Sequence, residues 1–262
     1  MERRYGEERS ARMPGALWQT IRLGTFTHVY PYTLGQRLPA GESELRIASN
    51  AADGTVLVML IFAPENGANV LHVNLIAVSD SFSMPAQPGF LPEVRRIFDQ
   101  AGIEIVVDDV YDLTGSPFDR MTDFPAPEAA PDSQFAELAR LASRREPSDA
   151  LNVFFVDALP GGLAGLSLGR PGPPVSTSYY YGVIVRRAAL DDVQAHLVAH
   201  EIAHFLGLQH IVNVTEAGRI DKDPILDTTL DEPNLMDLGT SLTPGQVFAL
   251  SRSAMLTTRG EE

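Results

Sequence analysis

The sequence predicts an α/β (α+β) fold in which helices pack on a mostly parallel, twisted sheet, preceded by a small β-rich segment. Residues 18–63 contain short apolar or alternating runs separated by turn residues, a pattern typical of strands and hairpins. After residue 66 the patterns of strands and helices alternate, which favours parallel strands joined by helices. With 262 residues and 44% hydrophobic content, the chain is long enough to bury a sizeable core.

The β-rich segment is expected to span residues 1–66. Its predicted strands are 25–30, 44–49 and 55–62. The last of these runs is almost continuously apolar, so we expect it to be buried on both faces. We interpret the segment as a small β-domain or a pro-segment-like unit. The turn-forming residues 64–67 mark the boundary to a second domain at 67–262.

The second domain begins with alternating strands and helices. Gly102 suits the C-terminal end of a helix, and Asp132 suits the N-cap of another. Residues 117–131 are proline-rich and acidic and are expected to form a surface loop. The predicted strands are 70–78, 103–110 and 151–156, and the predicted helices are 91–101 and 132–143.

Residues 200–210 carry three histidines and a glutamate at the spacing that a hydrolytic zinc site requires. His200 and His204 lie one turn, about 5.4 Å, apart on a helix, so both imidazoles can reach one ion. Glu201 is the next residue round the helix, where a general base belongs. Gly207 can end the helix and let the chain return His210 as a third ligand. Three protein ligands leave one position open for water.

His196 is a competing ligand that the spacing excludes. It lies eight residues before His204, about 12 Å along a helix axis, so the two cannot share a metal. A pair made of His196 and His200 would lack the glutamate, glycine and third histidine at the required offsets. The helix that carries these residues is expected to be capped by Asp191 or Asp192. Its apolar residues recur near helical spacing, at Val193, Leu197, Ile202 and Phe205.

Two further motifs follow the histidines. Residues 234–237 read Asn-Leu-Met-Asp, and 241–246 read Ser-Leu-Thr-Pro-Gly-Gln. In the second motif Thr243 can be an N-cap, Pro244 suits the first helical position and Gln246 completes a capping box. We therefore expect a last helix that runs to about residue 255.

The pattern of residues 200–210 resembles the zinc-binding motif of the metzincin clan of metallopeptidases. Met236 resembles the methionine of the clan's turn, which forms an apolar floor beneath the metal. Residues 221–246 look most like the pappalysin branch. The chain departs from that branch at Leu238, where a tyrosine usually stands, and in its lack of cysteines.

The resemblance implies a zinc-dependent endopeptidase that hydrolyses peptide bonds in proteins or peptides. Glu201 would act as general base on a water that zinc activates, and Met236 would support the site. Residues 161–174, rich in glycine and proline, would supply the clan's rim loop and edge strand, to which an extended peptide can add. Most metzincins act outside the cell, so we expect a secreted, bacterial-type protein, with a cytoplasmic one as the alternative.

The oxygen-rich stretch after the histidines is a candidate calcium site. Asp221, Asp223 and Asp227 supply carboxylates of the kind that Ca²⁺ binds, and the relatives often have such sites near the methionine turn. The alternative is a solvated acidic loop without an ion.

The composition of the chain limits the partners that it can bind. A formal net charge of −14 and a pI near 4.8 argue against nucleic acid and anionic membranes, which need basic faces. The sequence contains no run of 18 or more apolar residues, so we expect no segment that inserts into a bilayer. The absence of cysteine excludes thiol catalysis and disulfides. We expect a monomer.

The alternative is a protein that has the same fold but does not hydrolyse peptide bonds. The chain would then be an inactive or latent metal-binding protein whose main role is adhesion or ligand binding through segment 1–66. Without a cysteine to cap the zinc, latency would need steric blockage or a carboxylate, with Glu2, Glu7, Glu8 and Asp53 as candidates.

Overall fold

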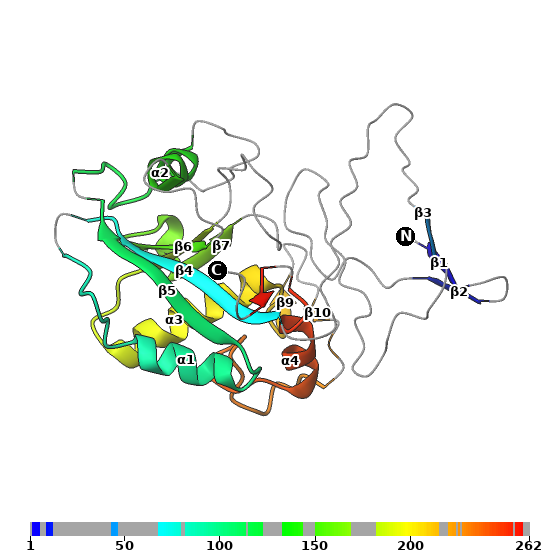
Figure 1. Cartoon of the computed structure of the whole chain (residues 1–262). Helices are drawn as coiled ribbons and strands as arrows, with labels where there is room; N and C mark the ends of the chain where they lie inside the picture. Colours follow the sequence, from blue (N-terminus) through cyan, green and yellow to red (C-terminus); the bar gives the residue numbers. More distant parts are fainter. Residues whose placement is uncertain are drawn as a thin grey trace.

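The structure is a computed structural model of residues 1–262, shown in Figure 1. It describes residues 2–5, 9–12, 43–46, 68–79, 82–113, 115–122, 133–143, 150–168, 182–214, 220–223, 225, 227–253 and 255–258. No helix within these ranges is long and apolar enough to cross a membrane.

A small antiparallel sheet lies near the N-terminus, in the order β2-β1-β3. It consists of β1 (Glu2–Tyr5), β2 (Arg9–Arg12) and β3 (Ser43–Arg46). β3 overlaps the predicted strand 44–49, whereas β1 and β2 were not predicted. The predicted strands 25–30 and 55–62 and the boundary at 64–67 lie outside the described residues.

A six-stranded, mostly parallel sheet forms the centre of the larger body, as predicted (Figure 1). Its parallel strands are β4 (Ala68–Ala77), β5 (Glu104–Asp112), β6 (Leu151–Val156) and β8 (Gly182–Arg186). β4 pairs with both β5 and β6, and β8 follows β6. Two antiparallel strands complete the sheet: β7 (Gly165–Leu168) on β8, and β11 (Thr257–Thr258) on the first residues of β4.

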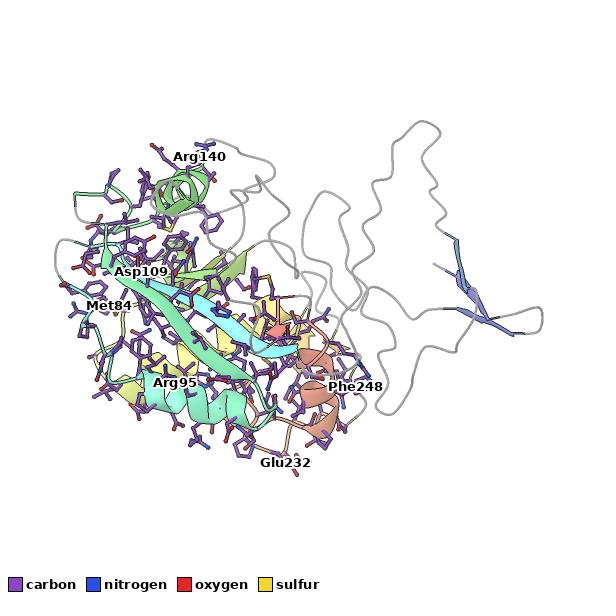
Figure 2. The ribbon with its side chains drawn as sticks, viewed as in Figure 1. Met84, Arg95, Asp109, Arg140, Glu232 and Phe248 are labelled. Atoms are coloured by element: carbon purple, nitrogen blue, oxygen red, sulfur yellow. The ribbon has the colours of Figure 1, made fainter. Side chains whose placement is uncertain are left out.

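Helices cover both faces of the sheet. They are α1 (Leu91–Asp99), α2 (Gln134–Ser143), α3 (Asp191–Leu206) and α4 (Pro244–Leu250). Leu71, Val73 and Leu75 of β4 pack on the side of α1 and α3, while Ile76 packs on the side of α2. This alternation follows the two-residue period of a strand. Figure 2 shows Arg95 of α1 and Arg140 of α2 on opposite sides of the sheet.

The helix ends differ in part from the predictions. Gly102 has a φ of 65°, the left-handed conformation expected after α1. α2 begins at Gln134, two residues after the start of the predicted helix 132–143, and Ser133 Oγ accepts a hydrogen bond from the Ala136 N–H. Asp132 itself lies outside the described residues. α4 ends at Leu250, earlier than the predicted end near residue 255.

The start of α3 corrects two predictions. Its N-cap is Leu190, and no side chain caps the helix there. Asp191 and Asp192 instead occupy the first turn, where carboxylates complement the helix dipole. Val193, predicted to face the core, is 45% exposed, whereas Ile202 and Phe205 are buried as expected. The first three residues of α3 are therefore exposed, and its buried residues begin at Gln194.

Candidate metal centre

α3 and the turn after it bring three histidines together. His200 and His204 lie one turn apart on the helix. Gly207 ends the helix with a φ of 120°, and its N–H donates to the Ala203 and His204 carbonyls. The Leu208 N–H also donates to the Ala203 carbonyl, so the chain reverses direction. This reversal returns His210 to the other two imidazoles.

The three imidazoles meet through their Nε2 atoms. The Nε2 of His210 lies 3.1 Å from that of His200 and 3.1 Å from that of His204. One ligand atom from each residue lies within 4.8 Å of the others. A tetrahedral ion with Zn–N bonds of about 2.0–2.1 Å holds its nitrogens about 3.3–3.4 Å apart. The donor set and its spacing therefore fit a zinc ion.

The Nδ1 atoms fix the orientation of both helical histidines. Nδ1–H of His200 donates to the Leu235 carbonyl at 2.7 Å, and Nδ1–H of His204 donates to the Leu208 carbonyl at 2.8 Å. A carbonyl can only accept, so each neutral ring has its proton on Nδ1 and a lone pair on Nε2. Burial lowers the pKa of His200 to about 4 and that of His204 to about 3. Both rings are thus neutral near pH 7 and able to bind a metal.

Glu201 follows His200 on α3 and is buried. Its side chain is 7% exposed, and burial raises the pKa of its carboxyl to about 8. The edge strand β7 packs on this side chain: a Cβ built on Gly165 would lie 2.6 Å from Glu201 Oε1. A pKa near neutrality is what a group needs if it accepts and then donates a proton.

The predicted methionine turn lies next to two of the histidines. Met236 is buried at 1% exposure and lines one pocket with His200 and His210. The preceding carbonyl, that of Leu235, is the acceptor for His200. The structure therefore places Met236 next to two of the candidate ligands.

A buried amide pair links this turn to α4. Asn234 Nδ2 donates to Gln246 Oε1 at 2.8 Å, and Gln246 Nε2 donates to Asn234 Oδ1 at 3.0 Å. Asn234 Oδ1 also accepts from the Met236 N–H. The predicted capping box of Thr243 and Gln246 is present, so one glutamine serves the helix cap and the turn. The sequence pattern indicated the cap but gave no sign of the link to Asn234.

His196 lies apart from the metal-binding atoms. Its ring centroid is 5.6 Å from that of His200, its side chain is partly exposed, and it is not in the three-residue group. This agrees with its exclusion on helical spacing.

The acidic stretch makes hydrogen bonds within the protein. Asp223 is buried and its Oδ1 accepts from Thr228 Oγ1, and Asp227 accepts from Thr243 Oγ1 and the Gly245 N–H at the start of α4. Asp221 belongs to β10 (Ile220–Lys222), which pairs with β9 (Val212–Val214). Among the side chains that the structure describes, Asp223 and Asp227 belong to no metal-binding group of three or more, and the side chain of Asp221 lies outside that set. Calcium binding remains a prediction.

A pocket of about 200 Å³ adjoins the histidines. It is lined by His200, His210, Ile211, Val212, Leu230, Met236 and Asp237. Leu238, which takes the place of the tyrosine of the pappalysin branch, is 90% exposed. Of the predicted rim segment 161–174, residues 161–168 are described and include β7, while 169–174 lie outside the described residues.

Comparison with known proteins shows partial likeness of fold. No family model matches the chain, and no curated protein is significantly similar to it in sequence. Metalloproteinase-II from Bacteroides fragilis is similar in structure, with a TM-score of 0.39 and 17% identity over 62% of this chain and 50% of that one. Archaemetzincin from Methanopyrus kandleri has a TM-score of 0.35 and 14% identity over 74% of this chain and 92% of that one.

A chaperone-substrate complex is also similar, with a TM-score of 0.35 and 13% identity over 56% of this chain and 25% of that one. This chain spans half the length of metalloproteinase-II. We infer the function of this chain from the site itself.

Proposed function

We propose that this protein is a zinc-dependent endopeptidase of the metzincin type that hydrolyses peptide bonds in proteins. The observation that carries the proposal is the convergence of the His200, His204 and His210 Nε2 atoms, with Glu201 beside them on the same helix. This arrangement leaves room for a fourth ligand, which separates catalytic from structural zinc sites.

The histidines would hold zinc as neutral imidazoles. When bound, zinc would polarise the scissile carbonyl and lower the pKa of water at the open position. The carbonyls of Leu235 and Leu208 keep the His200 and His204 rings oriented with their lone pairs toward the shared centre.

Glu201 is the general base and acid in this proposal. Its carboxylate takes a proton from the attacking water and its carboxylic acid returns that proton to the leaving amine. Its burial beside β7 keeps bulk water from competing for that proton.

The pocket next to His200 is where we place a substrate side chain. Its walls combine the apolar side chains of Ile211, Val212, Leu230 and Met236 with polar ones, among them the Asp237 carboxylate. Leu238 offers no hydroxyl where the pappalysin branch usually has one, so membership of that branch has less support than membership of the clan. Secretion of the protein is part of the same proposal.

The proposal is tested with a peptide library and the variant Glu201→Gln. Zinc-loaded wild-type protein should cleave peptides and lose activity with a chelator. Glu201→Gln should retain zinc while cleavage falls by at least about 10²-fold, because the amide cannot take up the proton. The control Glu137→Gln changes an exposed residue of α2, on the other side of the sheet, and should cleave normally. Undiminished cleavage by Glu201→Gln would refute the role of Glu201.

A further inference from the structure

Gly165 and Glu201 are in direct contact across the boundary between β7 and α3. A Cβ on Gly165 would lie 2.6 Å from both Cγ and Oε1 of Glu201 and 2.8 Å from its Cδ. Atoms that are not bonded pack at about 3.5–4.0 Å, so no side chain fits between them. The Glu201 side chain therefore lies on the bare backbone of the edge strand.

The reason for glycine at this position is space. Gly165 is not among the glycines of the described chain with positive φ, and it pairs regularly with Val185 of β8. Other residues could adopt the same backbone conformation. What they could not do is leave room for the Glu201 carboxylate.

Packing also determines where that carboxylate lies. Within the described residues no group donates a hydrogen bond to it, and its side chain is 7% exposed. On α3, Glu201 directly follows His200 and comes three residues before His204. The β7 backbone at Gly165 is thus a wall that limits its positions on one side.

We infer that Gly165 is a positioning residue for the catalytic base: its missing side chain lets the edge strand hold the Glu201 carboxylate at the metal centre. This inference rests on the proposed function. It makes the edge strand part of the catalytic apparatus as well as a place where substrate can bind.

A double-mutant cycle on the metal-free protein tests the contact without reference to activity. Gly165→Ala should lower Tm by several degrees, because the methyl group collides with a buried side chain. In the Glu201→Ala background the collision is gone, so the same change should lower Tm much less. Equal losses in the two backgrounds would show that the residues are not in contact and would overturn the inference.

Kinetics on the zinc-loaded protein test the positioning role. Gly165→Ala should reduce kcat at least tenfold with KM and zinc content close to those of wild type, because the base is displaced while the ligands remain. Glu201→Asp shortens the base by one methylene and makes room for the added methyl. Adding Gly165→Ala to Glu201→Asp should therefore cost no further activity.

The matched control is Gly89→Ala. Its Cβ would also meet a carboxylate, that of Asp191, but this carboxylate is exposed at the far end of α3. This variant should keep its kcat.

An unchanged kcat in Gly165→Ala would overturn the positioning role even if the cycle showed contact. An inactive wild-type protein would instead count against the proposed function. The metal-free cycle would still show whether Gly165 and Glu201 are in contact.

Discussion

Burial controls the protonation of three residues at the metal centre. It raises the pKa of Glu201 to about 8 and lowers the pKa values of His200 and His204 to about 4 and about 3. In the metal-free protein near pH 7 these side chains are therefore mostly neutral. Neutral imidazoles are the form that binds zinc, so the site is ready for the ion before it arrives.

The raised pKa of Glu201 predicts a pH dependence of stability in the metal-free protein. Between the unfolded pKa, about 4.5, and the folded pKa, about 8, the folded state holds more protons than the unfolded state. The contribution of Glu201 to stability is present below pH 4.5 and is lost as pH rises through 8. Glu201→Gln cannot ionise and should lack this loss.

Chemical denaturation at several pH values measures this effect. The variant should gain stability relative to wild type as pH rises from about 5 to 8, by a few kcal/mol in all. His200 and His204 act in the opposite direction, because their lowered pKa values add stability as pH rises toward 6.5, but both proteins share them. A constant difference between the two proteins across this range would show that Glu201 ionises normally.

At the scale of secondary-structure elements, α4 supports the metal centre through the turn at residues 234–237. The chain of contacts runs from Gln246 to Asn234, then through the turn to the Leu235 carbonyl and the His200 ring. Such outer contacts set the orientation of a ligand and typically change metal affinity when lost. α4 is thus connected to the site although none of its residues belongs to the histidine group.

Gln246→Glu tests this connection with little change in shape. The new oxygen cannot donate to Asn234 Oδ1, and it stands in a fully buried place. We expect a loss of about 1–3 kcal/mol in unfolding free energy and at least about tenfold weaker zinc binding. Denaturation and a competition titration with a chromogenic chelator measure the two.

Gln100→Glu is the control for that variant. Gln100 lies at the exposed C-terminal end of α1, where its amide donates to the Ile97 and Thr240 carbonyls. The Gln100→Glu variant should lose less than about 1 kcal/mol of unfolding free energy and bind zinc as the wild type does. Equal zinc affinity in both variants would mean that α4 does not influence His200.

The elements that the sequence predicts well are those with strong periodic patterns. β6 and α1 are buried or amphipathic along their length, and the structure places them within a few residues of the prediction. The predicted cap of α3 is wrong because two aspartates at a helix start fit the cap and the first turn equally well. β1 and β2 are polar strands without alternating apolar residues, so no periodicity marked them.

The site was predictable to the extent that its residues are close in sequence. Helical spacing and one glycine suffice to bring His200, His204 and His210 together. Gly165 and Gln246 reach the site only through the sheet edge and α4, contacts between distant segments that no local pattern encodes. A glycine in a glycine-rich stretch gave no sign that a carboxylate lies against it.

In the complete fold, α3 packs on one face of the central sheet. α1 and α3 share the core on that face, and α2 packs on the other (Figure 1). The ligand-bearing end of α3 adjoins the turn at 234–237 and the β9–β10 pair. A rigid helix anchored in a large core can hold two imidazoles at a fixed separation without metal, which agrees with the metal-free geometry.

We expect His200, His204 and His210 to bind one zinc ion and to leave one position open. X-ray absorption spectroscopy at the zinc edge, on protein loaded with one equivalent, tests it most directly. We predict three imidazole nitrogens and one non-protein oxygen at about 2.0–2.1 Å, and the same spectrum for His196→Ala. A fourth protein ligand, or a spectrum that changes in His196→Ala, would contradict the claim.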